Sequence, residues 1–138
     1  MVLIPRAVYR EVVEQGEGYA VMGQVRAARG VFLRVQAVLD SNRSTQIAAR
    51  QLLGTGESEA IVLAQESGAG ALLMDDHRAI RYARSLGIPV TRTPMLYAEA
   101  KARGWIPNVW DKLDAMRMNG FRLKDADYRL VLSKLGEL

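Results

Sequence analysis

The feature that most constrains the fold is the apolar run at residues 71–74, which follows a glycine-rich break and precedes two aspartates. A short apolar run with such boundaries predicts a parallel strand that is buried on both faces. A helical pattern follows at residues 77–86, and a second short apolar segment lies at residues 88–91. A strand, a helix and a strand in this order predict an α/β fold with a mostly parallel sheet.

The same alternation continues along the chain, with no repeat and no linker. A length of 138 residues favours one domain, over residues 1–138. No apolar run reaches the length of a membrane span, so we expect a cytoplasmic protein with no membrane contact. We predict further strands at residues 2–4 and 31–38, a loop at 54–56, and helices at 7–15, 19–29, 42–53, 57–67, 94–103, 109–118 and 125–134.

The composition limits the chemistry. The chain has no cysteine and one histidine, which excludes thiolate nucleophiles, cysteine metal sites and histidine-rich zinc sites. Metal chemistry would therefore use oxygen ligands, which favours Mg²⁺ or Mn²⁺. The net charge of +4 comes from residues 70–138, with 12 basic and 8 acidic side chains. This charge indicates either a partner such as a nucleic acid or an ordinary arginine-rich surface.

Four carboxylates are candidates for a site. Asp75 and Asp76 follow the strand at residues 71–74, and ligands bind beyond the carboxyl ends of parallel strands. Glu59 begins a predicted helix and Glu11 lies within another. Carboxylates that lie close together repel one another and raise one another's pKa. A divalent cation bound between them removes this repulsion. Structural alternatives remain open: one aspartate caps the following helix, Glu59 complements a helix dipole, and Glu11 lies in solvent.

The order of several motifs resembles an uncharacterised family of PIN-like proteins. Residues 56–64, 72–76 and 81–83 follow its pattern GE-x-EAI-x-LA, LL-x-DD and R-x-A. Residues 2–12, 100–107 and 120–123 extend the resemblance over nearly the whole chain. It implies a PIN-like three-layer fold, with a mostly parallel sheet flanked by helices. It also implies a nuclease of the toxin type, paired with a small antitoxin protein.

The resemblance assigns roles to named residues. Glu11, Glu59 and Asp76 match the catalytic and metal-binding acids, with Asp75 as a neighbouring ligand. Arg81 matches the arginine after the paired acids, which orients an acid or contacts phosphate; a solvated helix arginine is the alternative. We expect Arg78 to bind substrate as well. The implied cofactor is Mg²⁺ or Mn²⁺, and the implied substrate is RNA.

The chain departs from this family at its start. PIN-like chains begin with an apolar strand that ends in a metal-binding Asp, and this chain begins at what resembles the second strand. We expect an N-terminally truncated domain that lacks the central first strand, unless the true start lies upstream. Metal binding would then be weak or absent, and cleavage impaired. A partner chain, a swapped element or the strand at residues 31–38 would fill the empty sheet position, so we expect a homodimer or higher oligomer.

Two further functions stay open. The first is a non-catalytic binding or oligomerisation module derived from the PIN-like fold. The second is a flavodoxin-like or response-regulator-like domain, which also places acids at strand ends. That domain would need a lysine near a phosphorylated aspartate, and the nearest candidate, Lys101, has no distinctive context.

Overall fold

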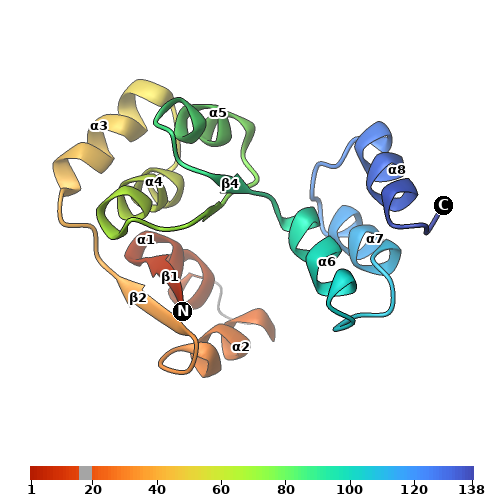
Figure 1. Cartoon of the computed structure of the whole chain (residues 1–138). Coiled ribbons are helices and arrows are strands. Elements are labelled where there is room, and N and C mark those ends of the chain that lie inside the picture. The colour runs from red at the N-terminus through yellow and green to blue at the C-terminus, as the bar shows by residue number, and fades with distance from the viewer. Residues whose placement is uncertain (16–19) are drawn as a thin grey trace. The chain divides into compact units, whose positions relative to one another are not determined.

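The computed structural model describes residues 1–15 and 20–138 of the chain (Figure 1). These residues form two compact units, Met1–Val90 and Thr91–Leu138. Each unit has its own cluster of buried apolar side chains. The single domain over residues 1–138 stays a prediction.

The strands of the first unit form two small sheets. Strand β1 (Val2–Pro5) pairs in parallel with β2 (Leu33–Gln36), and β3 (Leu72–Leu73) pairs with β4 (Val90–Thr91). The strand–helix–strand unit predicted at residues 71–91 is therefore present. Among the described strands these two sheets are separate. Strand β2 pairs with β1 and does not connect the β1 strand to β3 in one sheet. The class is mixed α/β, as predicted.

Helix α4 is the element of the first unit against which three other helices pack, whereas α2 contacts η1 (Figure 1). Consecutive residues of α4, from Ile61 to Ala64, are all buried, and a helix that is apolar on every side belongs in a core. Helices α1, α3 and α5 contact it. The helical elements of this unit are α1 (Arg6–Tyr9), the π-helix η1 (Arg10–Glu14), α2 (Ala20–Ala28), α3 (Ser41–Gln51), α4 (Thr55–Ser67) and α5 (His77–Ser85).

Three local predictions need correction or a limit. The strand at residues 71–74 is not buried on both faces, because Leu73 is 50% exposed. The loop predicted at residues 54–56 is wrong, since α4 already begins at Thr55. Gly56 is buried there, and a Cβ atom at this position would lie 3.1 Å from Val8 Cγ2. Tyr19, the predicted first residue of the second helix, lies outside the described residues.

The second unit is built from three helices after β4: α6 (Thr93–Ala102), α7 (Trp110–Met118) and α8 (Asp125–Lys134). Its core contains Val109, Leu113, Leu123 and Leu132. The helices predicted for this region are confirmed to within one residue at each end. None of the helices in the described parts of the chain has the length and apolar composition of a membrane span.

Candidate functional site

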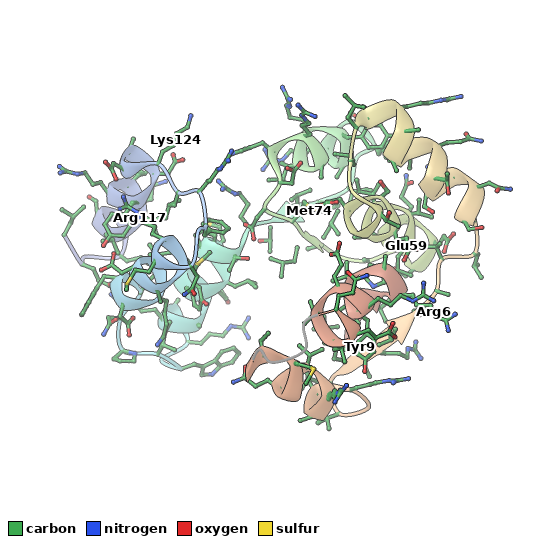
Figure 2. The ribbon with its side chains drawn as sticks, turned by 180° about the vertical axis from the view of Figure 1, so that it is seen from behind. Arg6, Tyr9, Glu59, Met74, Arg117 and Lys124 are labelled. Carbon is green, nitrogen blue, oxygen red and sulfur yellow. The ribbon has the colours of Figure 1, made fainter. Side chains whose placement is uncertain are left out.

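Glu59 links the start of α1 to α4. The backbone N–H of Ala7 donates a hydrogen bond of 2.9 Å to Glu59 Oε2. The N-cap residue of α1 is Pro5, which has no side-chain acceptor for the first amides of the helix. Glu59 therefore caps α1 from another element, and Figure 2 shows it beside α1, which carries Arg6 and Tyr9.

Glu11 lies on the same contact between the N-terminal helices and α4. It is exposed, and its Oε2 is 3.3 Å from the position that a Cβ atom would take on Gly56. Gly56 precedes Glu59 by three residues, about one helical turn. The structure thus places Glu11 of η1 beside Gly56, and Glu59 against Ala7, on neighbouring turns of α4.

Glu11 also lies in an unusual backbone segment. The N–H of Gln15 donates to the carbonyl of Arg10 at 2.9 Å, a bond that spans five residues and makes η1 a π-helical turn. Turns of this kind are rare in proteins, and those that do occur often lie at functional sites.

Asp76 is the N-cap of α5. Its Oδ1 accepts hydrogen bonds from the N–H groups of Arg78 and Ala79, both 2.9 Å long. The structural alternative predicted for one aspartate of the pair is therefore confirmed for Asp76. Asp75 precedes it and is half-buried.

Arg78 and Arg81 lie on the exposed part of α5. The buried face of this helix consists of Ala79, Ile80 and Ala83. Neither arginine has an ion-pair partner in the part of the chain that the structure describes, so both guanidinium groups face solvent.

The comparison with protein families is decisive for the classification. A family model described as a PIN domain matches residues 1–137. The chain belongs to the PIN domain family. PIN domains are nuclease-like and typically use divalent cations, and the predicted resemblance is confirmed at this level. No curated protein and no solved structure matches the chain.

The carboxylates of this PIN domain would be the ligands for such a cation. Among residues 1–15 and 20–138, no group of three or more acidic or histidine side chains is close enough to hold a metal ion. Glu59 and Asp76 each use one oxygen to accept backbone N–H groups. The described residues therefore do not form a three-carboxylate metal centre, and the catalytic and metal-binding roles of Glu11, Glu59, Asp75 and Asp76 stay predictions.

Sequence reasoning missed a hollow between α3 and α5 of this PIN domain. Its volume is about 210 Å³. The signal was present in the sequence, because α3 carries two arginines seven residues apart and no acid. The lining residues are Arg43, Gln46, Ile47, Arg50, Gln51 and Tyr82.

Sequence reasoning also missed Glu137, an acid of the second unit whose side chain is buried. Its side chain is 7% exposed and lies 2.6 Å from Lys101 Nζ. It accepts the N–H groups of Val109 and Trp110 at 2.8 to 2.9 Å, and so caps α7. Burial alone would raise the pKa of Glu137, but the bonds from Lys101 and the two amides hold this pKa below its ordinary value. No local pattern reveals such a cap, because its partners are 27 and 28 residues away.

Proposed function

We propose that this PIN-domain protein is a ribonuclease of the toxin type, which hydrolyses phosphodiester bonds in RNA with a weakly bound Mg²⁺ or Mn²⁺. The family match over residues 1–137 carries the proposal. The position of Glu11 beside Gly56, one turn before Glu59 on α4, supports it, as does the π-helical turn at Glu11. We expect weak cation binding because Glu59 and Asp76 already accept hydrogen bonds from backbone amides.

The exposed arginines of α5 favour an anionic substrate. Arg78 and Arg81 follow Asp76 on the first turns of the helix. A guanidinium group binds phosphate oxygens in a two-pronged geometry and stays charged at all physiological pH values. We propose that these two side chains contact the phosphates of RNA.

The test is cleavage of a labelled RNA with and without Mn²⁺, by the wild type and by the variants Glu59→Gln and Asp76→Asn. Each amide keeps an oxygen that accepts the same backbone N–H groups, so thermal unfolding should stay near that of the wild type. The loss of the negative charge should lower cleavage by about tenfold or more. Equal cleavage by the wild type and both variants would indicate a contaminating nuclease and contradict the proposal.

A second candidate is a non-catalytic binding or oligomerisation module of PIN origin. The specific observation in its favour is that Glu59 and Asp76 both act as helix caps. It predicts no Mn²⁺-dependent shift in thermal unfolding and a stable dimer in light scattering. A monomer that binds Mn²⁺ tightly would exclude it.

We also propose a small antitoxin protein as a partner and a homodimer or higher oligomer as the working form. Light scattering on the purified chain tests the oligomer directly, because a molar mass equal to one chain contradicts it.

A further inference from the structure

We propose that RNA continues from Arg78 on α5 into the hollow between α3 and α5, where one base stacks on Tyr82 and the neighbouring phosphates contact Arg43 and Arg50. We call these four residues the α3–α5 surface. The inference deepens the proposed function, because it rests on RNA as the ligand. It adds contacts to that ligand on an element, α3, that carries none of the predicted site residues.

The shape of the hollow fits part of a polymer. Its volume of about 210 Å³ is smaller than the 300–1,000 Å³ or so of pockets that enclose a whole small ligand. Two arginines, two glutamine amides and one aromatic ring line it. Cations, amides and a ring at one place match a single nucleotide, with its phosphate, base edge and base face.

The acids next to this surface in the chain, Asp40 and Asp76, accept backbone amides and pair with none of its guanidinium groups within the described residues. Helices α3 and α5 contain no Asp or Glu. Arg43 donates to the neutral amide of Gln65, and within residues 1–15 and 20–138 no carboxylate pairs with Arg43, Arg50 or Arg78. Two acids flank the start of α3, and both accept backbone amides: Asp40 from Arg43, and Glu66 from Leu39 and Asp40.

The helices hold the interacting groups at defined spacings. Arg43 and Arg50 are seven residues apart, so they share a face of α3 and are separated by about 10 Å along its axis. Arg78 precedes Tyr82 by four residues and shares its side of α5. Tyr82 packs partly against the core, so its ring is held in place before any ligand binds. An aromatic side chain together with nearby cations is the usual platform for single-stranded RNA.

An acidic protein partner is the competing occupant, and the ring and the amides argue against it. Carboxylates need only the cations, whereas a base would also use the aromatic ring of Tyr82 that lines the hollow. A base also uses the hydrogen-bonding groups of Gln46 and Gln51.

The test measures binding of a short fluorescent single-stranded RNA to the full chain by anisotropy, in EDTA and over a range of salt concentrations. The double variant R43A/R50A should bind about tenfold more weakly and reduce the slope of log affinity against log salt by about 1.4, since each phosphate contact contributes about 0.7. Y82L should weaken binding by about tenfold through the lost stacking, while Y82F should bind as the wild type does.

The charge-matched control is R34A/R84A. Both side chains are exposed, and Arg84 lies on the flank of α5 away from Tyr82. Equal losses in R43A/R50A and R34A/R84A would overturn the inference, because net charge alone would then explain the binding. Equal binding of polyglutamate and RNA, or an unchanged affinity in Y82L, would also overturn it.

Binding in EDTA does not depend on cleavage, which separates the two proposals. If the variants lose RNA binding as expected but the wild type cleaves no RNA, the result supports the α3–α5 surface and contradicts the ribonuclease. RNA cleavage by the wild type with no effect of R43A/R50A or Y82L on binding supports the ribonuclease and contradicts the surface.

Discussion

The two units of the molecule use their cations in different ways. In Thr91–Leu138, Lys101 lies 2.6 Å from Glu137, and Arg117 lies 2.6 Å from Asp125. On α3 and α5 of the first unit, the arginines have no carboxylate partner within the described residues. Cations that are paired inside the second unit stabilise its fold, whereas those on α3 and α5 stay available to an anionic ligand. The location of the unpaired cations therefore says more about a possible ligand than the net charge of the chain does.

The acids differ between the units as well. Asp76 caps α5 at an exposed position, whereas Glu137 caps α7 with a side chain that is only 7% exposed. The same kind of hydrogen bond therefore has different consequences when it is lost, since a buried donor cannot turn to water.

The largest effect is expected for Glu137→Ala. This change leaves Lys101 Nζ and the amides of Val109 and Trp110 without their common acceptor. The free energy of unfolding should fall by about 2–3 kcal/mol, as measured by urea denaturation followed through tryptophan fluorescence. Glu137→Gln should lose less, because its amide oxygen still accepts the backbone groups. A loss no greater than that of Asp125→Asn would show that the two carboxylates are equivalent and that the burial of Glu137 has no energetic consequence.

The stability should also depend on pH through Glu137. Its pKa in the folded state lies below the ordinary value of 4.5, so the unfolded chain binds the proton more tightly. The resulting stabilisation is fully present above about pH 4.5 and disappears as the pH falls through the pKa of the folded state. Denaturation of the wild type at pH 6 and pH 3 or so should show this loss, and Glu137→Gln should show a smaller one. An identical pH dependence of both proteins would contradict the assignment.

A smaller effect is expected for the exposed cap of the first unit. Asp76→Ala removes the acceptor of two amides at the start of α5 and should lower the free energy of unfolding by about 1 kcal/mol. Asp76→Asn should lie close to the wild type, because asparagine is an equally good N-cap. Thermal unfolding followed by circular dichroism measures both, and a large loss in the Asn variant would show that the charge of Asp76 has a structural role beyond capping.

The smallest effect is expected for the exposed pair Arg117–Asp125. Asp125 is 78% exposed, and such pairs contribute less than about 1 kcal/mol. Asp125→Asn should therefore change the urea midpoint only slightly. A loss equal to that of Glu137→Ala would remove the distinction between buried and exposed pairs in this unit.

The predicted N-cap of α5 depends on near neighbours and agrees with the structure. The cap formed by Asp76 was predictable because an acid before a helix reaches amides two and three residues ahead. The bond from Ala7 to Glu59 joins residues 52 apart, and no local pattern indicates it. The early start of α4 was missed for a similar reason. Gly56 has a low helix propensity, and its packing against Val8 on another element outweighs that preference.

The sequence by itself determined the α/β class, the PIN family and the three helices of the second unit, because periodicity, capping and motif order are properties of neighbouring residues. Only the tertiary structure decided which charged groups meet. It kept the predicted acids from forming a group of three or more within the described residues, placed Glu137 against the first amides of α7 and placed Tyr82 beside Arg43 and Arg50. Such contacts join residues that are far apart in the chain, and they form where burial of apolar surface brings the helices together.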